Sequence, residues 1–110
     1  MNDGGIGAVK YPLVADVKHE ICQAYDVEHA DGVAFRGSFL IDEDGLVRHQ
    51  VVNDLPLGRN VDEMLRMIDA LAFHQDHGEV CPAGWNKGDS GMKDTPEGVA
   101  AYLSENADKL

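Results

Sequence analysis

A very short turn between two β-rich stretches is the feature that most constrains the fold of this chain. Residues 34–41 and 46–52 are rich in residues that favour strands. Only residues 42–45 (Asp-Glu-Asp-Gly) separate them, and Asp-Gly is a strong hairpin signal. Because strands joined by so short a turn must run antiparallel, the sequence predicts a β-hairpin.

A helix follows the hairpin. Six apolar residues recur at offsets 0, 3, 4, 7, 10 and 11 from Val61, which is the spacing of one face of a helix. Asn60 is placed as the N-cap, and Glu63 stands three residues further on, as in a capping box. Gly78, after His77, supplies the C-terminal stop.

The segment before the hairpin is shorter and less regular. Residues 12–15 (Pro-Leu-Val-Ala) are typical of a short buried strand, with Pro12 tolerable at its start. Asp16 is expected to cap a helix over about residues 17–25. This strand would need neighbouring strands that the chain does not obviously contain.

Helical periodicity disappears after Glu79. Residues 81–85 (Cys-Pro-Ala-Gly-Trp) are expected to be non-helical, and residues 86–98 to form a mobile polar arm. A short helix over about residues 96–104 closes the chain. The expected order of elements is therefore β-α-β-β-α followed by a tail.

Composition narrows the class of protein. The 110 residues allow one domain at most, and 20 acidic against 9 basic residues give a net charge of −11. Nucleic acid and anionic membranes need a basic face, so both are disfavoured as partners. The start of the chain has no signal-peptide pattern, and no apolar run is long enough to span a membrane, so we expect a cytoplasmic location.

Five segments, in order and at compatible spacing, carry a resemblance to a known family. They are residues 4–7 (Gly-Gly-Ile-Gly), 12–16, 35–42, 52–63 and 77–85. Together they resemble the C-terminal half of a typical two-cysteine peroxiredoxin, of the thioredoxin peroxidase or alkyl hydroperoxide reductase C type. The resemblance implies the C-terminal half of an α/β, thioredoxin-like fold, with a partial core over residues 1–78 and an arm over residues 79–110.

The resemblance also implies a thiol-dependent peroxidase that reduces hydrogen peroxide and organic hydroperoxides. In such enzymes a peroxidatic thiolate attacks the O–O bond and becomes a sulfenic acid, which a second, resolving thiol converts to a disulfide. Cys81 matches the resolving cysteine, whose partner sulfur belongs to the other subunit of a dimer. Arg36 matches the arginine that faces the peroxidatic thiolate, and Arg59 matches a second arginine that supports it.

Each of these residues also has a plainer interpretation. Cys81 could be an inert packing cysteine, Arg36 an exposed strand residue, and Arg59 a loop charge beside a helix N-terminus. A metal site of His74, His77 and Cys81 would lack the four ligands that zinc usually requires. We therefore expect no metal and no cofactor.

Partners follow from the same resemblance. A thioredoxin-like or flavoprotein disulfide reductant is implied, as is a homodimer paired through the edge strand 46–52. Dimers of this family often assemble further into rings. In that strand, Arg48 and Gln50 are expected to face solvent, and Val47 and Val51 to face inward.

One departure from the family is clear. The Pro-x-x-x-Thr-x-x-Cys motif of the peroxidatic cysteine does not occur in the sequence, so the chain alone is expected to be inactive. An alternative is a non-catalytic dimerisation or assembly module. A further alternative makes Cys22 a surrogate peroxidatic thiol, although its place beside an apolar helix face favours a packing role. Residues 4–7 and Tyr102-Leu103 resemble elements linked to over-oxidation sensitivity.

Overall fold

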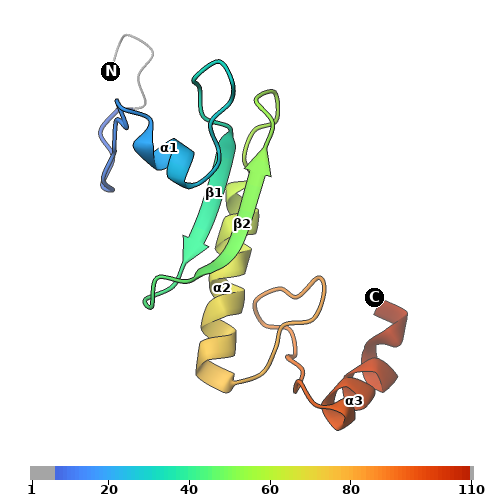
Figure 1. Cartoon of the computed structure of the whole chain (residues 1–110). Coiled ribbons are helices and arrows are strands. Elements are labelled where there is room, and N and C mark those ends of the chain that lie inside the picture. The colour runs from blue at the N-terminus through green and yellow to red at the C-terminus, as the bar shows by residue number, and fades with distance from the viewer. Residues whose placement is uncertain (1–6, 110) are drawn as a thin grey trace. The chain divides into compact units, whose positions relative to one another are not determined.

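The structure is a computed structural model that describes residues 7–109, in two compact units, Met1–Phe35 and Arg36–Leu110 (Figure 1). Its elements in chain order are α1 (Glu20–Ala24), β1 (Arg36–Ile41), β2 (Val47–Asn53), α2 (Val61–His77), α3 (Pro96–Asn106) and a final 3-10 turn (Ala107–Lys109). The division into a core over residues 1–78 and an arm over residues 79–110 stays a prediction.

The strand expected over residues 12–15 is not formed, and that prediction is wrong. Residues 12–16 have no regular secondary structure, and Leu13 and Val14 are 67% and 71% exposed. A strand exists only through hydrogen bonds to a neighbour, and the described part of the first unit offers no partner strand. Pro12 also lacks the N–H that such pairing would use.

The first helix is shorter than the sequence predicts. It covers Glu20–Ala24 rather than residues 17–25, and its N-cap is His19, not Asp16. The Asp16 carboxylate nevertheless accepts hydrogen bonds from the backbone N–H groups of Ile21 and Cys22, at 3.0 and 2.9 Å. Asp16 therefore satisfies free N–H groups of the first turn from outside the helix.

The hairpin is confirmed. β1 and β2 pair antiparallel, from Arg36 opposite Asn53 to Leu40 opposite His49. The register then shifts, because Ile41 lies opposite Val47 and Arg48 becomes an extra residue in β2. The expected alternation fails only at Val47, before the bulge, where the side chain is 49% exposed instead of facing inward; Arg48 and Gln50 are exposed and Val51 is half-buried, as predicted.

The second helix is also confirmed, with both of its ends. The side chain of Asn60 accepts a hydrogen bond from the backbone N–H of Glu63 at 3.1 Å. At the other end Gly78 adopts φ 69°, a left-handed conformation that favours glycine, and its N–H donates to the carbonyl of His74 at 2.8 Å. These local signals start and stop α2 where the sequence places them.

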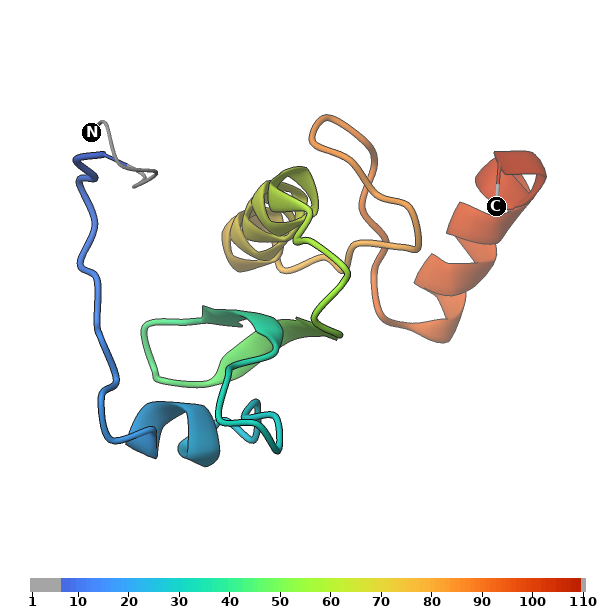
Figure 2. The same ribbon diagram turned by 90° about the horizontal axis from the view of Figure 1, so that it is seen from above.

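α2 lies along one face of the hairpin (Figures 1 and 2). Residues 79–95 then form loops, and α3 begins at Pro96, as the sequence predicts, with Thr95 as its N-cap; it extends to Asn106, two residues beyond the expected end. Buried apolar side chains are few among the described residues: Val27, Ala70 and Trp85. Val61, Leu65 and Ile68 of α2 remain 66%, 53% and 46% exposed. No helix in the described residues has the length and apolar character needed to cross a membrane.

The hairpin turn is held by one carboxylate. The side chain of Asp42 is 3% exposed and accepts from the backbone N–H groups of Asp44 and Leu46, at 2.9 and 3.0 Å. Its second oxygen accepts from Arg48 at 3.1 Å. These hydrogen bonds, that of Leu46 first, hold the pKa of Asp42 below its ordinary value.

Replacing Asp42 by alanine should therefore lower the Tm of the chain by several degrees at pH 7. Because the pKa of Asp42 is lowered on folding, its contribution is present above the ordinary pKa and is lost as the pH falls through the folded-state value. Thermal unfolding followed by circular dichroism between pH 3 and pH 7, a range chosen around an ordinary pKa of about 4, should show a flatter pH dependence in Asp42→Ala.

The matched control is Asp44→Ala, which removes an exposed carboxylate of the same turn. Equal losses of Tm in the two variants would contradict the assignment of this role to Asp42.

Candidate functional site

The structure brings Arg36 and Arg59 to the same end of the hairpin. Arg36 is the first residue of β1, and its Nε donates to the carbonyl of Leu55 at 2.7 Å. Arg59 lies in the loop before α2, and its Nε donates to the carbonyl of Gly37 at 3.3 Å. Arg36 is thus bound to the loop that carries Arg59, and Arg59 is bound to Gly37, the residue that follows Arg36 in β1.

Both guanidinium groups keep unused donors. Both residues are exposed, and no contact between described residues uses their terminal N–H groups. Arg59 lines a cavity of about 200 Å³ together with Ser38, Asn53 and Glu63. Two fixed cations with free donors can favour a thiolate or bind an oxyanion, which is the chemistry expected of this pair.

Cys81 lies elsewhere in the second unit. It follows α2 by four residues, and its Sγ donates to the carbonyl of Ala70 at 3.4 Å. Its cavity, of about 270 Å³, is mostly apolar and also contains two polar side chains. The residues that line it are Leu40, Arg48, Met67, Ala70, Leu71, His74, Val80 and Cys81.

The surroundings keep the Cys81 thiol protonated. Burial raises its pKa above the ordinary value of 9.0, and the nearby Arg66 cation opposes this only in part. The thiolate form of Cys81 is therefore disfavoured by its surroundings. Such a thiol is a poor attacking group towards peroxide, since the thiolate is the nucleophile.

Cys81 and the two arginines are not brought together within one chain. Cys81 contacts α2 at Ala70, ten residues after the Asn60 cap that adjoins Arg59. At about 1.5 Å per residue, this separation is roughly 15 Å along the helix axis. The three residues singled out by the sequence therefore occupy two locations. The arginines lie near the N-terminal end of α2, and Cys81 lies beside its central turns.

Arg66 is a residue of this region that sequence reasoning missed. Its Nε and Nη2 donate to the two carboxylate oxygens of Glu63, each at 2.7 Å, and its Nη1 donates to the carbonyl of Trp85 at 2.6 Å. The Glu63–Arg66 spacing of three is a recognisable helical pair. Nothing in the sequence indicates the contact to a carbonyl nineteen residues away.

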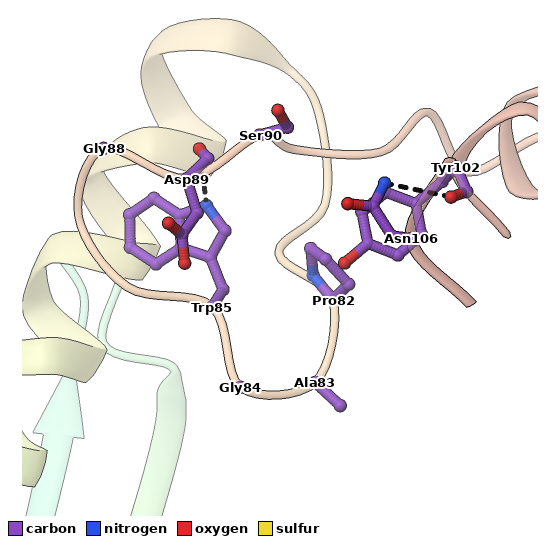
Figure 3. A pocket seen from close by; sticks show the side chains of 9 residues that line it. All are labelled: Pro82, Ala83, Gly84, Trp85, Gly88, Asp89, Ser90, Tyr102 and Asn106. Atoms are coloured by element: carbon purple, nitrogen blue, oxygen red, sulfur yellow. Dashed lines mark hydrogen bonds between the residues drawn. The ribbon is translucent and has the colours of Figure 1, made fainter. Parts of the chain in front are cut away.

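The loop after Cys81 lines another cavity, which lies between residues 82–90 and α3 (Figure 3). It measures about 320 Å³, and Tyr102 from α3 lines it opposite the loop. The indole Nε1 of Trp85 donates to the carbonyl of Asp89 at 3.1 Å and closes the loop on itself. Leu103 is 43% exposed, and residues 4–6 of the other expected element lie outside the described residues.

Cys22 has a different environment from Cys81. A hydrogen bond to the Asp16 carboxylate is the first cause of its raised pKa, followed by burial and by the charges of Asp16 and Glu28. An anionic neighbourhood disfavours a thiolate, which argues against a peroxidatic role for Cys22. Within residues 7–109, no three His, Cys, Asp or Glu side chains are grouped as metal ligands would be.

Comparison with known proteins identifies the family. Residues 2–50 match the AhpC/TSA family, and residues 70–105 match the C-terminal domain of 1-Cys peroxiredoxin. Alkyl hydroperoxide reductase C of Helicobacter pylori strain J99 is 62% identical over 107 residues, which are 97% of this chain and 54% of that protein. The chain belongs to the peroxiredoxin family.

Further relatives agree with this assignment. Alkyl hydroperoxide reductase C of Buchnera aphidicola from Schizaphis graminum is 59% identical over 94% of this chain and 52% of its own length. The reduced 2-Cys peroxiredoxin of Plasmodium vivax superposes with a TM-score of 0.88 at 50% identity, over 92% of this chain and 52% of that structure. The thioredoxin-like fold class is thereby confirmed, and this peroxiredoxin chain spans about half the length of the curated relatives it matches.

The protonated state of Cys81 in this peroxiredoxin chain can be tested directly. In a Cys22→Ser background, the rate of alkylation by iodoacetamide should rise with pH to a midpoint above 9.0. In urea the midpoint should fall to the ordinary value, because burial is the main cause of the shift. A midpoint of about 8 or lower in the folded chain would contradict this prediction.

Proposed function

We propose that this chain supplies the resolving thiol and the two active-site arginines of a thiol-dependent peroxidase that reduces hydrogen peroxide and organic hydroperoxides. The observation that carries the proposal is the pairing of Arg36 and Arg59 at one end of β1, at a distance from a protonated Cys81. A resolving thiol needs access to a sulfenic acid rather than a low pKa of its own. The arginines need a thiolate to stabilise, and that thiolate is not Cys81 of the same chain.

The catalytic cycle then divides between thiols. A peroxidatic thiolate beside Arg36 attacks one peroxide oxygen, the O–O bond breaks, and water or an alcohol leaves. Cys81 condenses with the resulting sulfenic acid, which forms a disulfide and releases water. A thioredoxin-like or flavoprotein disulfide reductant returns both sulfurs to thiols. The chain has no Pro-x-x-x-Thr-x-x-Cys motif, so the first thiol must come from another polypeptide segment.

The proposal is tested by complementation. The chain alone should show no appreciable peroxide consumption with a thiol reductant, because neither of its thiols is activated. Together with a second polypeptide that carries the N-terminal part of a peroxiredoxin and its Thr-x-x-Cys motif, peroxide should produce a disulfide that joins that cysteine to Cys81. Mass spectrometry of non-reduced peptides identifies the bond.

Matched cysteine variants serve as controls. Cys81→Ser should abolish the cross-link, whereas Cys22→Ser should leave it unchanged. Robust turnover by the chain alone, or a cross-link through Cys22, would contradict the proposed division of roles.

The second component of the proposal is a homodimer formed through β2. Among the described residues, β1 and β2 make a sheet of only two strands, so the outer edge of β2 has no strand beside it. Such an edge is a template for pairing with a second copy of the chain. A dimer would also allow Cys81 of one subunit to serve the arginines of the other.

Gln50 lies at the centre of β2 and is exposed. In a two-fold antiparallel pair, Gln50→Lys would place like charges near each other, which disfavours pairing. Sedimentation over a concentration series should show a dissociation constant several-fold weaker than that of the wild-type chain. Glu43→Gln, in the turn, changes the net charge equally and is the control; equal weakening in both variants would argue against pairing through β2.

A further inference from the structure

The loop that carries Cys81 is fixed to its surroundings on both sides of the thiol. Before it, Val80 and Met92 exchange two backbone hydrogen bonds of 2.7 and 2.9 Å. After it, Trp85 is 3% exposed, and its ring lies 5.1 Å from that of Phe73 of α2. A Cβ added to Gly91 would lie 2.5 Å from the Phe73 ring, so the returning part of the loop also packs closely against α2.

Several polar contacts connect this loop to α2: Nδ1 of His74 lies 2.8 Å from the carbonyl of Glu79, Cys81 donates to the carbonyl of Ala70, and Arg66 binds Trp85. The carbonyl of Trp85 accepts from Nη1 of Arg66 at 2.6 Å, while Glu63 binds the other side of the same guanidinium with both carboxylate oxygens. Glu63 thus fixes the plane of the guanidinium, Nη2 also donates to the sulfur of Met67 at 3.6 Å, and Nη1 is directed at the loop. A planar fork with several donors can hold both partners at once, whereas a lysine ammonium has no such fixed geometry.

We propose that Arg66 is a positioning residue that latches the Cys81 loop onto α2 and thereby sets when the thiol becomes available. This inference rests on the proposed resolving role of Cys81, and it adds the residue that controls access to that thiol. In the latched state Cys81 is held against the carbonyl of Ala70 and stays protonated. Loss of the contact between Arg66 and Trp85 frees the loop and exposes the sulfur.

Two interpretations of Arg66 predict opposite changes in the pKa of Cys81 when Arg66 is removed. If Arg66 acts only as a nearby cation, its loss raises the pKa of Cys81, because its charge lowers that pKa. If Arg66 is a latch, its loss releases the thiol from burial, which is the larger cause of the raised pKa, and the pKa falls towards 9.0. The sign of the change therefore separates a latch from a local charge.

The test uses Arg66→Gln in the full chain with the Cys22→Ser background. The alkylation midpoint of Cys81 should fall, and the rate at pH 8 should rise several-fold. Trp85 is the only tryptophan of the chain, so its fluorescence reports on the same loop. Its emission should shift to longer wavelength, with stronger quenching by acrylamide. Arg66→Lys keeps the charge without the fork and should give an intermediate result.

The matched control is Lys87→Gln, which removes one cation from an exposed position of the same loop and should change neither readout. Should Arg66→Gln fail to fold by circular dichroism, Glu63→Gln leaves Arg66 in place but weakens its orientation. It should shift both readouts in the same direction by a smaller amount. Unchanged tryptophan emission with an unchanged or higher midpoint would overturn the proposal. Neither readout depends on peroxidase activity, so failure of the latch proposal can be distinguished from failure of the resolving role proposed for Cys81.

Discussion

Burial of Trp85 against α2 is the interaction on which the rest of the Cys81 region depends. At 3% exposure it is the most buried of the few core side chains among the described residues. An aromatic ring of this size supplies more apolar contact than any other single side chain of the loop. Its backbone carbonyl meets Arg66, and its indole N–H closes the loop at Asp89. Cys81, four residues before it, is therefore held in a loop that is folded but not part of any helix or strand.

Helix α2 separates the two arginines of this peroxiredoxin chain from Cys81. Its N-terminal end adjoins Arg59, which binds β1 next to Arg36, and its central turns adjoin Cys81. Glu63 lines the cavity of Arg59 and also orients Arg66. A shift of this one carboxylate would affect both locations. The separation is consistent with the proposed mechanism, in which Cys81 of one subunit serves the arginines of the other.

The sequence could predict the elements whose causes are local. The Asp-Gly turn, the Asn60 cap and the Gly78 stop each act through residues within four positions, so the hairpin and α2 were both predicted. The strand at residues 12–15 failed because a strand is defined by its neighbour. The one-residue bulge at Arg48 could not be derived from alternation alone.

For the site, family resemblance selected Cys81, Arg36 and Arg59, and the structure shows which of them lie together. The role of Arg66 was missed because helical periodicity shows which residues share a face of α2, but not which backbone groups of a distant loop contact that face. Its pair with Glu63 is visible in the sequence, but the contact to Trp85 depends on the path of a loop without periodicity.

The central claim is that Cys81 rests protonated in a held loop and reacts only when that loop is released. Hydrogen exchange over residues 79–92 tests this most directly, before and after Cys81 is converted by cystamine to a mixed disulfide. A blocked sulfur can no longer donate to the carbonyl of Ala70, so protection of the Val80 and Met92 amides should fall. Unchanged protection with the sulfur blocked would contradict the account, because Cys81 could then react without any release of the loop.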